Sequence, residues 1–355
     1  MTSTAPRFRL TDLPVPFVGA PMAGGPSTPA LAAAVTAAGG LGFLAAGNRP
    51  VEGVRADVQA VRARTTGPFG VNVFVPQAAN TAEPGSAVDP AVHRSVAAYR
   101  EALQEEARHY GVELPATDPA DDDGWTAKLA LLEELRVPVV SFTFGLPAAS
   151  VLERLAAAGT TTSVTVTSVP EARAAAGAGA DLLIVQGPAA GGHRGTHRAE
   201  GVPGEDPLEV LVAAVRAAVG IPLVAAGGIA DRADAEAARS AGADAVQVGT
   251  LLLRTHEAGT APVYREALGS GRYRETAVTR AFSGRPARGL RNGFIDRYTH
   301  IAPAAYPQVN QLTKPLRAAA TAAGDPEAVS LWAGPAFAAA RECPASDVVA
   351  QIARG

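Results

Sequence analysis

The sequence predicts an α/β protein built on a (β/α)8 (TIM) barrel, with an insertion after the third strand and a smaller subdomain after the eighth. Apolar runs of strand length alternate with helical patterns, which indicates parallel strands. The alternation continues until eight strands are present, and several of them end at glycine-rich turns. The 355 residues exceed the roughly 250 of a typical barrel, which leaves room for both additions.

The first half of the barrel contains four expected strands and two clear helices. A helix over 29–38 begins at Ser27, Thr28 and Pro29 and ends at two glycines. Helical periodicity follows over 51–64. Prolines surround a charged helix near 93–110, so we expect an insertion over 76–124. The four strands are expected at residues 16–22, 41–46, 69–75 and 137–144.

The second half continues the alternation and ends in roughly a hundred residues that a minimal barrel does not require. We expect the barrel over 1–254, insertion included, a substrate-covering excursion over 255–340, and a helix returning to the barrel within 341–355. The strands are expected at residues 161–167, 182–186, 221–226 and 245–248. The intervening helices are expected at 147–158, 170–178, 207–219 and 231–241. The excursion should contain a hairpin (277–282 and 289–295) and helices at 314–323 and 327–340, before a final helix at 346–353.

Composition excludes several classes of protein. Hydrophobic residues make up 47% and charged residues 18%, which argues against a disordered chain. A formal net charge of −3 without a basic cluster argues against nucleic-acid binding. Cys343 is the only cysteine, which excludes an intrachain disulfide and a cysteine metal cluster. We expect a cytoplasmic protein that binds no metal and no membrane, as a monomer or a homodimer.

The chain is organised around Gln186–Gly195, which directly follows the apolar run 182–185. A buried strand that stops at a glycine-rich turn is typical of the catalytic mouth of an α/β barrel. Within this stretch only His193 exchanges a proton near neutral pH without large tuning. It is therefore the candidate catalytic residue, and the alternative is a polar loop residue with no role in chemistry.

Glycines end the last two expected strands, at Gly227-Gly228 and within the run Gln247, Val248, Gly249 and Thr250. Backbone N–H groups at these two ends of a barrel converge on a phosphate, helped by the following helix N-terminus. Tight strand-to-helix turns also use glycine, so either strand end alone is weak evidence for a phosphate site. The two together favour phosphate binding.

Three further strand ends offer groups suited to a planar heterocycle: Met22, Asn72 and Gln186. A carboxamide donates and accepts hydrogen bonds together, which suits a flavin ring edge. Each of these side chains could equally make contacts with the backbone of a loop and have no ligand. Together with the phosphate site they favour FMN over a phosphosugar, and no early Gly-x-Gly-x-x-Gly pattern indicates a Rossmann NAD site.

With these residues in view, the sequence resembles the nitronate monooxygenase family over nearly its whole length. The resemblance rests on Gly19–Met22, Asn72, 139–142, Gln186–Gly195, Gly227-Gly228 and Gln247–Thr250. Two distal motifs are more diagnostic than the glycines: 283–290, and Tyr306-Pro307 through 312–317.

The resemblance implies FMN in the barrel and oxidation of an alkyl nitronate, with O2 consumed and a carbonyl compound and nitrite formed. Neutral nitroalkanes are a further expected substrate. His193 matches the base of the family. Positions for the cofactor are Ala20, Pro21, Met22, Asn72, Gln186, Gly191, Gly192, Gly227, Gly228, Gln247, Val248, Gly249 and Thr250. Positions for the substrate are Thr143, Tyr306, Asn310 and Lys314.

The sequence departs from the family pattern at three places. Thr143 stands where some members have a second histidine, Asn310 where an aromatic residue is frequent, and Pro335-Ala336 where Gln-Gly is frequent. These departures bear on substrate range more than on the cofactor. We expect the segment from Tyr306 to Lys314, with the hairpin around Arg285, to cover the flavin.

Two alternative functions remain open at this point. A flavin-type enoyl-acyl-carrier-protein reductase or an NAD(P)H:quinone reductase resembles the same barrel, although the distal Lys314 motif favours the oxygenase. A non-catalytic flavin or phosphate-binding barrel is the other, with Arg285, Arg288 and Arg291 making protein contacts. Arginines beside turns more often bind carbonyls and carboxylates structurally, which favours an enzyme.

Overall fold

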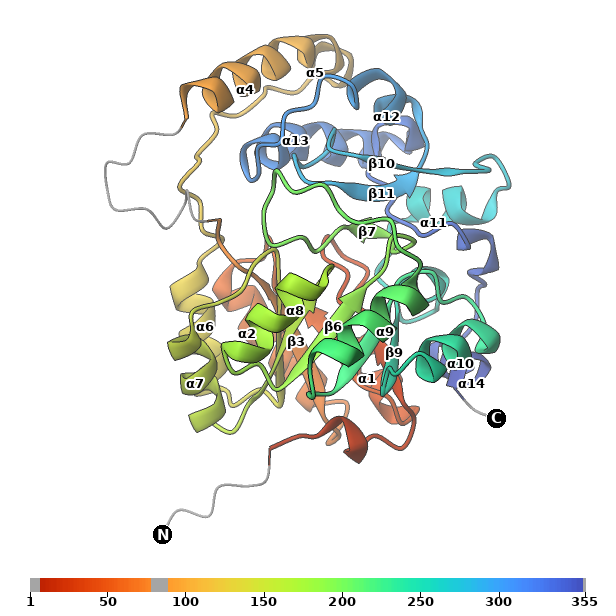
Figure 1. Ribbon diagram of the computed structural model, residues 1–355. Helices are drawn as coiled ribbons and strands as arrows, with labels where there is room; N and C mark the ends of the chain where they lie inside the picture. The colour runs from red at the N-terminus through yellow and green to blue at the C-terminus, as the bar shows by residue number, and fades with distance from the viewer. Residues whose placement is uncertain (1–6, 78–88, 354–355) are drawn as a thin grey trace.

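A computed structural model describes residues 7–77 and 89–353. Its centre is a parallel eight-stranded sheet in the order β1-β9-β8-β6-β5-β4-β3-β2 (Figure 1). Leu41 joins the two ends of this order, because Gly19 N donates to Leu41 O at 2.9 Å and Leu41 N donates to Phe17 O at 2.9 Å. The expected (β/α)8 barrel is confirmed. Residues 78–88 of the expected insertion, and residues 354–355, lie outside the described part.

All eight expected strands are present. Their bounds are β1 (Phe17–Gly19), β2 (Gly42–Ala45), β3 (Phe69–Phe74), β4 (Val139–Thr143), β5 (Thr161–Val166), β6 (Leu182–Gln186), β8 (Leu223–Ala226) and β9 (Ala245–Val248). Neighbouring strands are in parallel register, with Asn72 beside Ser141 and Gln186 beside Ala226. This register brings the predicted site residues to one end of the barrel.

Helices surround the barrel and bury one face each against it (Figure 1). In α2, for example, Val54, Val58 and Val61 are buried at helical spacing. Thr28 caps α1 by accepting from Leu31 N at 2.9 Å, as the start signal predicted. The surrounding helices are α1 (Pro29–Ala37), α2 (Val51–Arg62), α6 (Trp125–Glu134), α7 (Ala149–Ala157), α8 (Val169–Gly177), α9 (Leu208–Ala218), α10 (Arg232–Ser240) and α14 (Ala345–Ala353).

A second layer lies over the C-terminal end of the barrel strands and has its own apolar core (Figure 1). Two helices between β3 and β4 supply part of it, α4 (Pro90–Ala102) and α5 (Gln104–Tyr110). Their Tyr99 and Leu103 are buried with Phe294 and Leu316 from beyond the barrel. The remaining elements of this layer are α11 (Pro262–Gly269), β10 (Thr276–Thr279), β11 (Ala287–Leu290), α12 (Gly293–Tyr298) and α13 (Gln308–Ala323).

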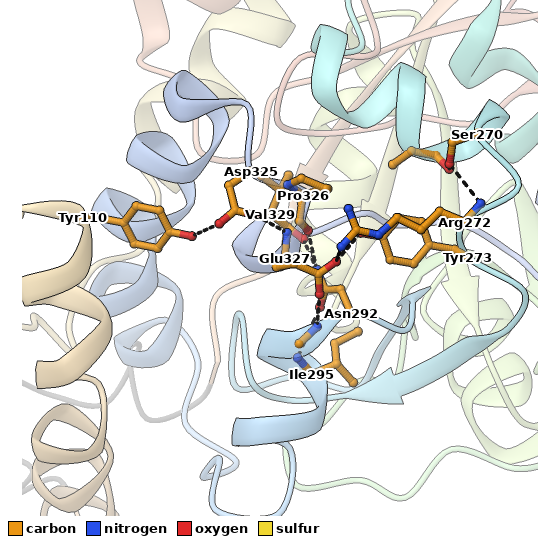
Figure 2. Close-up of polar contacts among 12 residues, drawn as sticks. Tyr110, Ser270, Arg272, Tyr273, Asn292, Ile295, Asp325, Pro326, Glu327 and Val329 are labelled. Atoms are coloured by element: carbon orange, nitrogen blue, oxygen red, sulfur yellow. Dashed lines mark hydrogen bonds and ion pairs between the residues drawn. The ribbon is translucent and has the colours of Figure 1, made fainter.

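Polar contacts tie the segments of this layer together (Figure 2). Glu327 accepts from Arg272 Nη2 and from Tyr273 OH, each at 2.7 Å, through Oε1. Its Oε2 accepts from Gly293 N at 2.6 Å. Tyr110 OH, at the end of α5, donates to Asp325 Oδ2 at 2.7 Å. Segments far apart in sequence therefore meet at two neighbouring carboxylates, where charge-assisted hydrogen bonds are strong.

The expected hairpin is shorter than predicted, and the residues after it form α12. Asn292 caps that helix by accepting from Ile295 N at 3.2 Å. Its Nδ2 also donates to Pro326 O and Val329 O, at 2.8 and 2.9 Å. The strand expected to continue to 295 ends at Leu290, because a capping asparagine starts a helix after it.

The helix expected over 327–340 is wrong. This segment holds only the short 3-10 turns Pro326–Ala328 and Phe337–Ala339. Between them the chain runs extended against β11, because Leu290 N donates to Leu331 O at 2.9 Å and Ala333 N donates to Arg288 O at 3.2 Å. Tertiary backbone pairing therefore overrides the local alanine-rich propensity. The helix expected from 314 begins earlier, at Gln308, and α11 was not predicted.

Candidate active site

The loop that carries His193 is fixed from both sides. On the barrel side, Gln186 Nε2 donates to His193 O at 3.0 Å, and Gln186 Oε1 accepts from Gly195 N at 2.7 Å. On the covering side, the two-residue strand β7 (Gly192–His193) pairs antiparallel with β11, with His193 opposite Ala287. Both ends of the Gln186 carboxamide therefore bind loop backbone, the second of the two roles considered for it.

The imidazole of His193 is half-buried between aromatic rings. Its Nε2 lies 2.8 Å from Ser283 Oγ. The ring centroid is 5.4 Å from that of Phe144 and 5.3 Å from that of Trp332. A ring held this closely keeps one orientation, which a positioned general base requires.

Phe144, directly after β4, has an unusual backbone. Its φ is 76°, although its side chain is large and only 1% exposed. Its ring lies 4.5 Å from Phe74 and 5.5 Å from Tyr306, and the Arg285 guanidinium carbon lies 4.2 Å from the ring centroid. Positive φ at a bulky residue is rare and persists only where the surroundings determine it. Together with His193, these three neighbours fix this ring as a wall of the site.

Burial, together with the positive charges of Arg285 and Arg317, lowers the pKa of His193 to about 3. Burial also lowers the pKa of each guanidinium to about 10. The imidazole is therefore neutral at physiological pH, the form that can accept a proton.

Asn72 and Thr143 meet at the ends of β3 and β4. Asn72 is 3% exposed, and its Nδ2 donates to Ser141 Oγ at 2.9 Å and to Thr143 Oγ1 at 3.0 Å. Thr143 Oγ1 is also 3.3 Å from Thr165 Oγ1. The position where a second histidine was considered thus belongs to a hydroxyl and carboxamide cluster inside the barrel mouth.

Glycine-rich segments from four parts of the chain converge at the ends of β8 and β9. A Cβ added at Gly228 would lie 3.0 Å from Ala189 Cβ, and one at Gly191 would lie 2.5 Å from Gly334 N. Gly334 N itself donates to Thr250 Oγ1 at 3.0 Å. Such close approach requires glycine at these positions, and glycine-rich turns at these two strand ends are the kind of place where backbone N–H groups bind a phosphate.

The remaining predicted cofactor positions lie around this convergence. A Cβ at Gly249 would meet Ala20 Cβ at 3.2 Å and Met22 Sδ at 3.7 Å, which places the segment with Pro21 beside β9. Gly227 has a φ of 102°, and a Cβ there would lie 2.8 Å from Ala190 N. Gly192 follows Gly191 in the same loop. Val248 packs its side chain toward the outer helices, so only its backbone faces the site, and Val248 O accepts from Ala20 N at 2.9 Å.

Gln247 provides a test of whether this place suits a flavin. Its Oε1 is buried, and within the described residues it has no hydrogen-bond partner. An unsatisfied buried acceptor is costly unless a ligand supplies a donor. The orphaned acceptor beside a glycine cradle fits a ligand with an N–H edge and a phosphate, which FMN has.

The predicted substrate positions are divided between the site and the surface. Tyr306 is half-buried with its ring against Phe144. Asn310, in α13, accepts from Arg317 Nη2 at 2.7 Å through Oδ1 and donates to Asn48 Oδ1 at 3.2 Å. Lys314 is exposed on α13, three residues before Arg317. The structure therefore places Tyr306 against the aromatic wall, Asn310 in contact with Arg317 and Asn48, and the lysine in solvent.

The family model described as "Nitronate monooxygenase" matches residues 7–355. The chain belongs to the nitronate monooxygenase family. A nitronate monooxygenase from Pseudomonas aeruginosa is 39% identical, over 96% of this chain and 96% of the relative. A probable nitronate monooxygenase from Staphylococcus aureus is 34% identical, over 97% and 95%.

Solved structures agree with this family. A nitroalkane oxidase from Streptomyces ansochromogenes superposes with a TM-score of 0.87 at 47% identity, covering 96% of this chain and 95% of its own. FabK from Thermotoga maritima superposes with a TM-score of 0.73 at 30% identity, covering 98% and 95%. The chain is thus an oxidoreductase of the nitronate monooxygenase family, more similar to the oxidase than to FabK.

Within residues 7–77 and 89–353, no helix is long and apolar enough to cross a membrane. The same ranges contain no group of three or more His, Cys, Asp or Glu placed to hold a metal ion.

Sequence reasoning did not assign several residues that surround His193. Ser283 and Arg317 lie in motifs that carried the resemblance, so a signal for them existed, but their role did not follow from it. The only signal for Phe144 was its place at the end of an expected strand. The only signal for Trp332 was the rarity of tryptophan in this sequence. What brings them to the imidazole is tertiary packing.

The low pKa of His193 predicts a specific acid sensitivity. Unfolded, His193 takes up a proton near pH 6.5, whereas folded it stays neutral to about pH 3. The unfolded state therefore binds more protons between about pH 6.5 and 3. As the pH is lowered through this window, the free energy of unfolding decreases by at most about 1.4 kcal/mol per pH unit. His193→Gln should flatten this slope in urea denaturation between pH 6 and 4. Parallel profiles for both proteins would contradict the assignment.

Proposed function

We propose that this protein uses FMN to oxidise alkyl nitronates, and neutral nitroalkanes after loss of a proton, with O2 to a carbonyl compound and nitrite. Family membership and the similarity to a nitroalkane oxidase support nitronate oxidation. The observation that carries the proposal is the position of the His193 imidazole, held 2.8 Å from Ser283 in the loop that also carries Gly191 and Gly192.

The proposed FMN site has two parts, one for the phosphate and one for the edge of the flavin ring. The backbones of Gly191, Gly228 and Gly249 would hold the phosphate, and Gln247 Oε1 would accept from the ring edge. When bound there, FMN would supply the acceptor for the electrons of the nitronate and pass them to O2. The protein contributes position and electrostatics.

His193 would take the α-proton of a neutral nitroalkane. Its fixed ring suits this role, and the support is geometric, because a pKa of about 3 makes the imidazole a weak base in the ligand-free protein. A nitronate has already lost that proton, so its oxidation requires binding in the pocket but no proton removal by His193. The aromatic walls formed by Phe144, Tyr306 and Trp332 would keep water from the reacting carbon.

The first test identifies the electron donor. We expect the purified protein to be yellow and to lose its flavin absorbance when mixed anaerobically with an alkyl nitronate, then regain it with O2. NAD(P)H, mixed separately under the same conditions, is the comparison. Rapid bleaching by NAD(P)H with none by the nitronate would instead favour the reductase alternative.

The second test locates the phosphate. Gly228 and Gly159 have nearly the same backbone, with φ of 88° and 90°, but only Gly228 faces another segment, while a Cβ at Gly159 meets nothing within 4 Å. Gly228→Leu should give colourless protein because its side chain would fill the cradle. Gly159→Leu carries the same backbone strain and should remain yellow. Full flavin content in the Gly228 variant would place the phosphate elsewhere.

The third test separates proton removal from oxidation. His193→Asn keeps a hydrogen-bonding side chain but cannot act as a base, so it should lower the rate on a neutral nitroalkane by about 10² to 10⁴-fold. On preformed nitronate the rate should stay within roughly tenfold of the parent, a barrier change of about 1.4 kcal/mol. Equal losses on both substrates would show that His193 positions the ligand instead.

A further inference from the structure

We propose that Gln77 and Arg285 are positioning residues for the imidazole of His193, because together they hold Phe144 and the loop 194–201 in one arrangement. Each of the two side chains binds Phe144 O with one end and the backbone of this loop with the other. We call this arrangement the clamp. Its kinetic consequence rests on the proposed function, whereas its effect on the position of the imidazole does not.

Gln77, three residues after the end of β3, joins two segments that are far apart in sequence. Its Nε2 donates to Phe144 O at 2.9 Å, and its Oε1 accepts from Ala199 N at 3.1 Å. A carboxamide can donate and accept at the same time, so one side chain satisfies a carbonyl and an N–H group of different segments. Gln77 therefore ties the end of β4 to the loop that follows His193.

Arg285 makes the same connection from the covering layer. Its Nη2 donates to Phe144 O at 3.3 Å, and its Nη1 donates to Thr196 O at 2.9 Å. The guanidinium carbon also lies 4.2 Å from the centroid of the Phe144 ring. The planar, rigid fork of an arginine can hold two carbonyls and stack on a ring at once. Phe144 O thus accepts from two side chains, and both of them also hold the loop.

Phe144 is the residue in this arrangement that needs such support. Its φ is 76°, a conformation that a bulky side chain keeps only where its surroundings impose it. In this conformation the ring lies edge-on to the imidazole of His193, with 5.4 Å between centroids and 78° between planes. A return of Phe144 to an ordinary backbone conformation would take the ring away from the imidazole.

The main chain of Arg285 supports the imidazole from a second direction. Arg285 N donates to Ser283 Oγ at 3.3 Å, and this hydroxyl lies 2.8 Å from His193 Nε2. One residue therefore supports both the ring that packs against the imidazole and the hydroxyl that is hydrogen-bonded to it. Loss of the clamp should loosen the imidazole on both sides.

A looser imidazole should affect the two substrate forms differently. A base must lie within hydrogen-bond reach of the proton that it removes, and small misplacements are costly to the rate. Under the proposed function, a neutral nitroalkane requires proton removal by His193, whereas a preformed nitronate does not. The clamp should therefore matter more for the nitroalkane.

The first experiment measures the position of the imidazole and not activity. The protein as purified is labelled with ¹³C at histidine Cε1, and the His193 signal is identified as the one lost in His193→Gln. Neighbouring aromatic rings shift this signal, because the Phe144 and Trp332 centroids lie 5.4 and 5.3 Å from it. Gln77→Met removes both bonds at similar side-chain length, so it should move or broaden the His193 signal. The signal of His109, in α5, should stay unchanged.

Gln311→Met is the matched control. Gln311 Oε1 accepts from Asp118 N at 2.8 Å and its Nε2 donates to Asp118 O at 3.1 Å, so this carboxamide also has both ends on backbone. Among the described residues it makes no hydrogen bond to Phe144 or to the loop 194–201. It should leave the His193 signal in place. An unmoved signal in Gln77→Met, or an equal change in Gln311→Met, would overturn the proposal.

Arg285→Lys provides a second variant in case circular dichroism shows that Gln77→Met is misfolded. It keeps the positive charge but loses the fork, so it cannot hold Phe144 O and Thr196 O together. It should change the His193 signal in the same way. A folded Arg285→Lys protein with the signal of the parent would contradict the clamp.

A kinetic comparison tests the consequence. In Gln77→Met, kcat/KM on a neutral nitroalkane should fall at least about tenfold, against less than about threefold on preformed nitronate. Equal losses on both substrates would show a general structural effect and overturn the role in proton removal. If the parent did not oxidise nitronate while the His193 signal still depended on Gln77, the proposed function would fail and the clamp would stand.

Discussion

The short pairing of β7 with β11 is the interaction on which the site depends. It joins a loop of the barrel to the covering layer at the residue that carries the imidazole, and Arg194 N extends it by donating to Pro286 O at 2.8 Å. Gln186 holds the same loop from the barrel side. His193 is therefore located by backbone hydrogen bonds to two different layers, which fixes it more firmly than a free loop would.

The covering layer is stable enough to serve as a wall because two distant chain segments build one core. Helices from between β3 and β4 contribute Tyr99 and Leu103, and the post-barrel segment contributes Phe294 and Leu316. Tyr99 OH also donates to Ala281 O at 2.7 Å, directly before the segment that carries Ser283. The packing of the insertion thus supports the hydrogen-bond partner of the imidazole, although the two are far apart in sequence.

The sequence predicted what local patterns control. Apolar runs with glycine-rich ends located eight strands and the loop of His193, since buried parallel strands and tight turns leave clear signals. Long-range contacts left none: the positive φ of Phe144, the extended course of 329–333 along β11 and the bond between Asn310 and Arg317 all depend on partners from elsewhere in the chain. Lys314 shows the converse, a motif residue whose side chain lies in solvent.

The double attachment of the His193 loop also limits how molecules enter. A covering layer that swung away as a rigid body would pull β11 from β7, or carry the imidazole off the barrel and break its link to Gln186. Rotating a single side chain therefore breaks fewer backbone hydrogen bonds than moving the whole covering layer. Any opening of the cover must therefore break backbone hydrogen bonds on one side of the His193 loop, so access to the imidazole is tied to the stability of those bonds.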